Sequence, residues 1–285
     1  MRHLILSGLL LASLAVSMAE ERCMTREEDR EVGLADLREA CSQADLVLVG
    51  TLGDLEPFTL GEGQHQLRGF RGKIQVAEIL YGRGSAGAVP LLWQNPLAQS
   101  APKVDHSGNE GKRRIWILTK DADGTWHADQ NHWVRPLEDR PEVEKTLQDR
   151  LAPALKVLEA SDSLKGEGEW VRPPAEWEAC DTLGNAGPAA FPSVRRLLAA
   201  PSPVQRSWGC RAVGALKDRN LAKDLETLLG DATPLNINGC EAIPTTVGKQ
   251  ALEALGSIAG RTFADLDEGR AWIGKLGYSP EHKGE

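Results

Sequence analysis

The second half of the chain repeats one pattern of small and apolar residues three times. Residues 247–258 place such residues at i, i+4, i+5, i+8 and i+11, and residues 205–216 and 175–186 match them. The three segments start 30 and 42 residues apart, at positions 175, 205 and 247. Periods of this size are typical of helical-repeat arrays, in which each unit buries its apolar face against a neighbour. The pattern therefore predicts a stack of helices, and by itself it specifies no chemistry.

Two of the repeats end alike, with Ala-Val-Gly-Ala-Leu at 212–216 and Ala-Leu-Gly-Ser-Ile at 254–258. Shorter apolar segments at 194–198 and 225–229 precede them. On these residues the region 175–260 resembles HEAT repeats, in which each unit is a pair of antiparallel helices. The resemblance implies that the shorter segments are the first helices of their pairs.

Further positions in this region have expected places in the array. Arg206 stands where HEAT repeats place an arginine early in the second helix, and Gly248 replaces it in the later repeat. Residues 231–246 are an insertion relative to the first repeat. Residues 267–276, with Trp272, are expected to form a terminal capping helix, because an array needs a polar outer end.

The chain starts with the pattern of a secretory signal peptide. Arg2 supplies a positive charge, residues 4–16 are an apolar run, and residues 17–19 place small side chains before a cut at Glu20. A membrane anchor is the rival interpretation, but the run is too short to cross about 30 Å of hydrocarbon. We therefore expect a cleaved signal peptide over 1–19 and a secreted or periplasmic protein that is not in the membrane after cleavage. Its compartment would permit disulfides.

The first half of the mature chain changes from a helical to a strand pattern. Thr25 begins a capping box, which predicts a helix, and Gly33 is expected to interrupt it before a second short helix. Apolar and β-branched runs bounded by Gly then predict strands, with a tight hairpin turn at Asp123-Gly124. Short strands with long Gly-rich loops predict a small closed barrel. The predicted strands are 45–52, 69–80, 88–93, 114–119, 125–129 and 132–135.

Two segments of this half carry a second resemblance. Leu-Val-Leu-Val-Gly-Thr at 46–51 follows a helix, and Ile-Gln-Val-Ala-Glu-Ile-Leu-Tyr-Gly spans 74–82. Together they resemble the OB-fold module of tissue inhibitors of metalloproteinases and netrins, over about 23–136. In those inhibitors the free α-amine beside the first Cys of a Cys-x-Cys start binds the protease zinc, and the matching position here is Cys23. The chain departs from that pattern at Thr25, and three residues precede Cys23 after the expected cut.

The sequence therefore predicts an α+β protein of two domains, a small OB-like β-barrel followed by an α-helical HEAT-like repeat array. Pro136 and Pro141 mark the exit from the barrel, and Pro153 is expected to kink or restart the helix that follows. We expect the two domains to be separable because their periodicities differ. The predicted divisions are the signal peptide 1–19, the barrel domain with its N-terminal helix 20–136, a helical linker and loose segment 137–174, and the repeat domain 175–285.

Three motifs that could carry chemistry are given structural interpretations. Residues 82–87 spell G-x-G-x-x-G, but a strand pattern follows where a dinucleotide site needs a helix, so a flexible connection is predicted. Residues 121–124 begin like a calcium loop but lack the Glu at its twelfth position. Residues 68–73 mix basic and aromatic side chains as single-strand binders do, and we interpret them as a solvated strand edge. The formal charge of −8 excludes general affinity for nucleic acid.

Four His residues are candidates for metal ligands. His127 and His132 flank one strand, while His65 and His106 stand on expected loops. Zinc needs three or four converging ligands, and an i, i+5 pair in a strand points to opposite faces. We therefore interpret them as scattered surface residues, and we expect no metal, no cofactor and no catalytic residue.

Five cysteines in an oxidising compartment allow at most two intramolecular disulfides. Cys180 and Cys210 hold equivalent places in successive repeats, about 8–10 Å apart on packed helices, whereas a disulfide needs Cα atoms within roughly 7 Å. Cys210–Cys240 is favoured, because Cys240 lies in an inserted loop that starts beside the helix of Cys210. Cys23–Cys41 can form only if the helix between them breaks, and Cys180 is then the free, buried thiol.

These features lead to three hypotheses about function. The first is an exported, non-catalytic protein that binds an unidentified protein partner through the barrel loops or the curved surface of the array. The alternative is a metalloprotease inhibitor that acts through the barrel domain, and the third is a hydrolase whose site is assembled by the fold. The sequence specifies neither the partner nor the oligomeric state, because fold analogy does not supply function.

Overall fold

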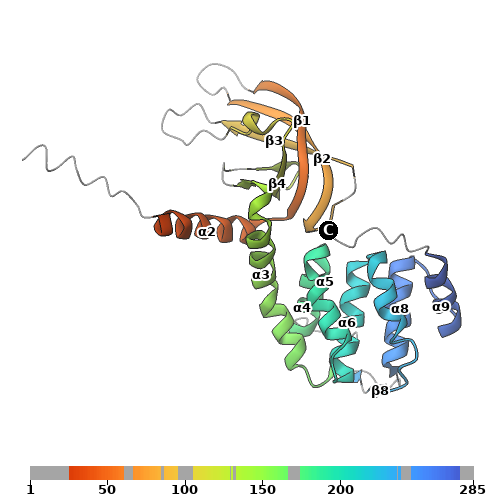
Figure 1. The fold of residues 1–285 in the computed structure, drawn as a ribbon. Coiled ribbons are helices and arrows are strands. Elements are labelled where there is room, and N and C mark those ends of the chain that lie inside the picture. The colour runs from red at the N-terminus through yellow and green to blue at the C-terminus, as the bar shows by residue number, and fades with distance from the viewer. Residues whose placement is uncertain are drawn as a thin grey trace, which may run out of the picture.

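The computed structural model is an α+β structure in which a sheet lies at one end of a helical array (Figure 1). It describes residues 26–60, 67–84, 87–95, 105–128, 130, 133–165, 174–235, 237–238 and 245–276. The expected signal peptide, Cys23, His65, His132 and Cys240 lie outside the described residues. Of the helices that are described, none is long and apolar enough to span a membrane.

Six strands of the described part form one sheet. They are β1 (Leu46–Leu60), β2 (Leu67–Tyr81), β3 (Ala88–Asn95), β4 (Arg113–Lys120), β5 (Trp126–His127) and β6 (Val134–Arg135). The predicted strands are confirmed in place and order, and β1 is longer than predicted. It continues through an irregularity between Gly53 and Glu56, where Asp54 has a positive φ of 55°. The predicted turn at Asp123-Gly124 joins β4 to β5, with a φ of 91° at Gly124.

The sheet curls so that β1 and β4, which stand far apart in the strand order, lie side by side. The strands pair in the order β1-β2-β3-β5-β4-β6, and β4 pairs again with β1, from Leu46↔Leu118 to Thr51↔Arg113. β5 is only two residues long and joins β3 and β4 through two residue pairs each. The prediction of a closed barrel is therefore wrong, and the structure has a curled six-stranded sheet in which only the two-residue strand β5 joins β3 to β4.

Alternate residues of the strands face two different apolar clusters. Leu46 and Leu48 of β1 lie inside the curl with Trp116 of β4. Val47 and Val49 point to the opposite face, which helices cover. The cluster on this second face continues through the helices of the C-terminal half. One apolar core therefore crosses the boundary between the expected domains, and the domain limits themselves stay a prediction.

Two helices connect the sheet to the array. α2 (Arg26–Gln43) passes through Gly33 unbroken, so the predicted interruption is absent; a glycine inside a helix costs only about 1 kcal/mol relative to alanine. α3 (Arg140–Ala160) likewise passes through Pro153 as one helix. Arg150 of α3 donates to the Cys41 and Ala44 carbonyls at the end of α2, at 2.6 and 2.9 Å. The buried residues of α3 recur every three or four positions and therefore lie on one helical face; they are Val143, Leu147, Leu151, Leu155 and Leu158.

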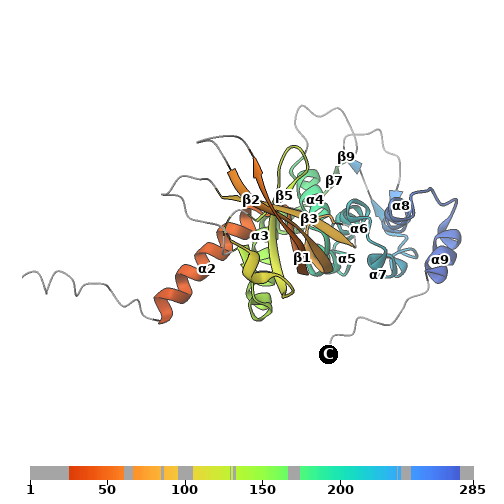
Figure 2. The same ribbon diagram turned by 90° about the horizontal axis from the view of Figure 1, so that it is seen from above.

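The helices after α3 form two rows (Figure 2). One row consists of α4 (Ala175–Asn185), α6 (Pro203–Leu216) and α8 (Val247–Ala259). The other consists of α5 (Phe191–Leu198), α7 (Ala222–Glu226) and α9 (Leu266–Lys275). Neighbours in sequence pack as pairs, α3 with α4, α5 with α6 and α7 with α8. The predicted helices and their arrangement as a helical array are thereby confirmed.

Side-chain caps fix where the helices of the array begin. The hydroxyl of Ser202 accepts from the Gln205 amide before α6, and that of Thr246 accepts from the Lys249 amide before α8. Such caps satisfy amides that the first turn of a helix leaves unpaired. The described parts of the 231–246 insertion include the short strands β8 (Pro234–Leu235), β9 (Ile237–Asn238) and β10 (Thr245–Thr246); β9 pairs with β7 (Leu164–Lys165) and β10 with β8.

Candidate functional site

One face of the α4–α6–α8 row carries a hollow of about 270 Å³. Small residues of α6 and α8, among them Gly214, Ala215 and Ala254, form part of its lining. The remaining lining residues are Trp177, Cys180, Asp181, Cys210, Arg211, Gln250, Glu253 and Ser257. A second hollow, of about 420 Å³, shares Glu253 and Ser257 and extends past the end of α8. Together the two hollows form a groove that crosses three successive helices.

Three charged residues of the groove hold the same place in their repeats. Asp181, Arg211 and Glu253 each stand six residues after the repeat starts at 175, 205 and 247. Equivalent positions on packed helices lie about 8–10 Å apart. The face therefore presents acidic, basic and acidic groups in sequence. The charges follow the same period as the apolar residues, but the apolar pattern alone does not identify them.

An aromatic and a guanidinium group are stacked at one end of the groove. The guanidinium carbon of Arg211 lies 3.1 Å from the centre of the Trp177 ring. Both side chains are half-buried, and both line the hollow. A cation over an indole face is held by the ring quadrupole, typically by about 0.5–2 kcal/mol. Two residue types that are common at protein interfaces are therefore fixed in place beside the hollow.

Glycines allow the row to pack closely beneath this face. A Cβ at Gly184 of α4 would lie 2.6 Å from the Cβ of Ala215 on α6. Gly248, near the start of α8, packs instead against the segment that follows α7, where a Cβ would lie 2.8 Å from the Leu229 carbonyl oxygen. Gly248 occupies the place where the earlier repeat has Arg206, so the space that a longer side chain would need is filled by backbone.

The structure places two of the disulfide candidates, Cys41 and Cys210, and the expected free thiol, Cys180, in buried positions. Cys41, Cys180 and Cys210 are each buried and unpaired with another sulfur. The expected partners of Cys41 and Cys210, which are Cys23 and Cys240, lie outside the described residues, so the Cys210–Cys240 and Cys23–Cys41 pairings stay predictions. Cys210 packs inside the array, and the unbroken α2 removes the bend that Cys23–Cys41 pairing requires.

Burial also makes these thiols poor nucleophiles. Burial raises the pKa of Cys41 to about 11 and that of Cys180 to about 12, although the nearby guanidinium groups of Arg150 and Arg211 oppose the shift. Burial raises the pKa of Cys210 as well. The thiolate is the reactive form of cysteine, so at neutral pH all three side chains behave as small apolar groups.

We expect the three described thiols to react slowly in the folded protein. At pH 8, a thiol with a pKa near 11 has roughly 200-fold less thiolate than a free cysteine with a pKa of about 8.5. Alkylation by iodoacetamide, followed by mass spectrometry of the peptides, should therefore be at least about 100-fold slower at Cys41, Cys180 and Cys210 in native protein than in urea. Equal native and urea rates at any of them would contradict their buried placement.

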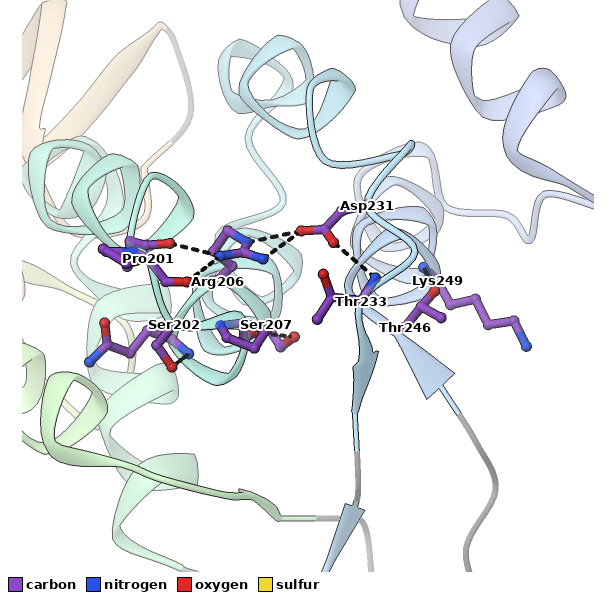
Figure 3. A network of polar contacts seen from close by, with 11 residues as sticks. Pro201, Ser202, Arg206, Ser207, Asp231, Thr233, Thr246 and Lys249 are labelled. Atoms are coloured by element: carbon purple, nitrogen blue, oxygen red, sulfur yellow. Dashed lines mark hydrogen bonds and ion pairs between the residues drawn. The ribbon is translucent and has the colours of Figure 1, made fainter.

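A polar network links α6 to the segment that follows α7 (Figure 3). Arg206 of α6 donates from Nε to Asp231 Oδ2 at 2.9 Å, and its Nη1 donates to the Ala200 and Pro201 carbonyls at 2.9 and 2.8 Å. Asp231 Oδ1 accepts from the Thr233 amide at 3.0 Å. Burial alone would raise the pKa of Asp231, but the hydrogen bonds from Thr233 and Arg206 outweigh it and lower that pKa.

The described His residues differ from their prediction as surface residues. His106 is buried between Trp93 and Trp116, with ring centres 5.3 and 5.9 Å away, and its Nε2 lies 2.9 Å from the Ala128 carbonyl oxygen. His127 is buried too. His127 lies on the two-residue strand β5, where alternation is too brief to predict burial, and His106 lies in the loop before a short 3-10 helix, where no periodicity applies. Within the described ranges, His, Cys, Asp and Glu form no group of three or more that could hold a metal.

The other motifs have structural roles. The described part of the G-x-G-x-x-G segment joins β2 to β3, and a strand follows it, as predicted. The basic and aromatic segment 68–73 lies on β2, which pairs with β1 on one side and β3 on the other, so the predicted edge position is wrong. Its Arg71 lies over the Phe58 ring, and its Lys73 lies 3.7 Å from Asp54.

The comparisons with known proteins assign no function to this site. No protein-family description and no curated protein matches the chain. Among solved structures, the chain is similar to the complex of CpcE and CpcF of phycocyanin lyase from Nostoc sp. PCC7120, at 20% identity and a TM-score of 0.26. The match covers 43% of this chain and 49% of that chain, so this chain spans about half the length of that neighbour. A likeness of this extent carries no argument about activity.

Proposed function

We propose that the protein is exported and binds a polypeptide partner along the α4–α6–α8 face without catalysing a reaction. The supporting observation is the groove across three successive helices, with small residues in its lining and the Trp177–Arg211 stack at one end. Aromatic and arginine side chains dominate binding energy at protein interfaces. Export is supported by the signal-peptide pattern of residues 1–19.

The chemistry of the groove favours binding over catalysis. Cys180 and Cys210 line it, but their raised pKa values keep them protonated and unreactive at neutral pH. The charged residues Asp181 and Glu253 stand on different helices, separated by α6. Charges in such a row are suited to orient a partner and to reject one of the wrong charge pattern. These properties do not favour the hydrolase hypothesis at this face.

Site-specific crosslinking tests the proposal. A photo-crosslinking amino acid at Ser257, which is exposed beside the groove, should give a discrete adduct with one protein in the exported fraction of the native host. The same residue at exposed Glu226 of α7, in the other row, should not. Adding Arg211→Glu should reduce the Ser257 adduct at least about tenfold, because it removes the stack and inverts the central charge. Identical adducts from both positions, or an adduct insensitive to Arg211→Glu, would show that the α4–α6–α8 face is not the partner-binding surface.

We also propose that the curled sheet is an OB-like module. Its support is the strand order β1-β2-β3-β5-β4 with the added β1–β4 pairing, which suits a five-stranded, partly open barrel. Metalloprotease inhibition through this module stays a prediction, because Cys23 lies outside the described residues. N-terminal sequencing of the exported protein discriminates it, since only a chain that begins at Cys23 offers the free amine.

A further inference from the structure

The end of β2 makes a direct connection between the sheet and the helical array. The Gly82 amide donates to the Ala186 carbonyl at 2.9 Å. Arg83 donates from Nε to the Gly184 carbonyl at 3.2 Å and from Nη2 to the Ala215 carbonyl at 2.9 Å. These acceptors are 101 and 132 residues away in sequence. One side chain from the sheet therefore reaches two helices of the array at once.

Both acceptors lie where helices need donors. α4 ends at Asn185 and α6 ends at Leu216, so the carbonyls of Gly184 and Ala215 belong to the last turns. The last four carbonyls of a helix have no partner within it, and they form the negative end of the helix dipole. A guanidinium group is a permanent cation with several donors in a rigid fork. Arg83 therefore caps both helices and fixes the distance between their ends.

Glycines make this approach possible and leave no room for larger residues. Gly82 has a φ of 88°, and a Cβ there would collide with the Asp45 carbonyl oxygen. Gly187 has a φ of 60°, and its Cβ would collide with the Gly82 carbonyl oxygen. The backbones of the sheet and the array are therefore in contact at one defined position, which holds the Arg83 fork in register with its acceptors.

The same helix ends shape the groove. Ala215 both accepts from Arg83 and lines the hollow, and Cys180, one turn before Gly184, lines it as well. We infer that Arg83 is a positioning residue that sets the spacing of α4 and α6 and thereby the shape of the hollow. The sheet is then a structural support for the face that the array presents. Only the link to partner binding rests on the proposed function; the link to helix spacing does not.

Hydrogen exchange on the full chain tests the inference. In Arg83→Gln, amides in the last turns of α4 and α6 should exchange about tenfold faster, because those turns lose their shared cap. α8, which Arg83 does not cap, should keep its protection and serves as the internal reference. Arg113→Gln, at an exposed arginine of β4 in the same sheet, is the matched control and should leave both helices unchanged.

A second variant separates the fork from its charge. Arg83→Lys keeps a cation near the helix ends but cannot donate in two directions from a rigid plane. We expect it to protect the two last turns to an intermediate degree, and it remains measurable if Arg83→Gln folds poorly. Unchanged exchange in both variants, or equal acceleration in α8, would overturn the inference. No partner is needed for this measurement, so its failure is distinct from a failure of the crosslinking test.

Discussion

Trp208→Ala should lower the free energy of unfolding by about 3–5 kcal/mol, which is the usual cost of emptying a large aromatic site in a core. The Trp208 side chain is fully buried on α6. Its indole Nε1 donates to Ser161 Oγ at 3.0 Å, just beyond the end of α3, and its carbonyl lies 3.8 Å from Cys180 Sγ on α4. Removing the ring would leave a cavity where three helices meet. Urea unfolding followed by circular dichroism measures the loss.

Two further variants sharpen that measurement. Trp272→Ala, at a half-buried Trp of α9 near the end of the array, should cost clearly less than Trp208→Ala. Trp208→Phe retains most of the apolar ring but lacks the N–H, so Ser161 Oγ loses its donor. Its loss of stability should lie between those of Trp208→Ala and Trp272→Ala. If Trp208→Ala costs no more than Trp272→Ala, the packing of α6 against α3 and α4 is not as described.

The local pattern of the sequence predicts the helices of the array and the strands of the six-stranded sheet, but not the short strands β7 to β10. Positions such as Ala251, Leu255 and Ile258 follow a period of 3.6 because each helix of the array buries one side. The strands were equally visible, since β-branched runs ended by glycine have few other uses. Whether a segment forms a helix or a strand depends largely on residues that are close together in the chain, and the sequence shows these directly.

Features that depend on distant partners could not be predicted in this way. A glycine such as Gly33 is a typical helix breaker, but α2 packs against α3 and continues through Gly33 as one helix. The sequence predicts a sheet that closes fully, but β5 is only two residues long, shorter than the strand predicted at 125–129, and its pairing does not close the sheet. The acceptors of Arg83 lie more than one hundred residues away, so no local period reports them. The groove has a weak sequence signal in the common repeat position of Asp181, Arg211 and Glu253.

Arg206→Ala should destabilise the protein by about 2–3 kcal/mol at pH 7, because it leaves a largely buried carboxylate without its cation. The side chains of Arg206 and Asp231 are each only 16% exposed, and they lie 2.8 Å apart from Nη2 to Oδ2. The same change removes the donors to the Ala200 and Pro201 carbonyls. Arg206→Lys should recover little of the loss, since an ammonium group cannot serve all three acceptors in one plane.

An exposed ion pair of the same kind provides the control. Arg195 and Asp224 join α5 to α7 at 3.0 Å, but the Arg195 side chain is 52% exposed. Arg195→Ala should therefore cost less than about 1 kcal/mol, as is usual for surface pairs. Similar losses for Arg206→Ala and Arg195→Ala in urea unfolding would show that burial does not strengthen the Arg206–Asp231 pair.

The pH dependence gives an independent test of that pair. The pKa of Asp231 is lowered in the folded protein from its ordinary value of 3.8. A lowered carboxyl pKa contributes stability that is present above the ordinary value and is lost as pH falls through the folded value. The stability difference between the native sequence and Arg206→Ala should therefore be constant from pH 7 to about 5 and should shrink below about pH 4. A difference that stays constant down to pH 3 would mean that Arg206 acts through the Ala200 and Pro201 carbonyls and not through the carboxylate.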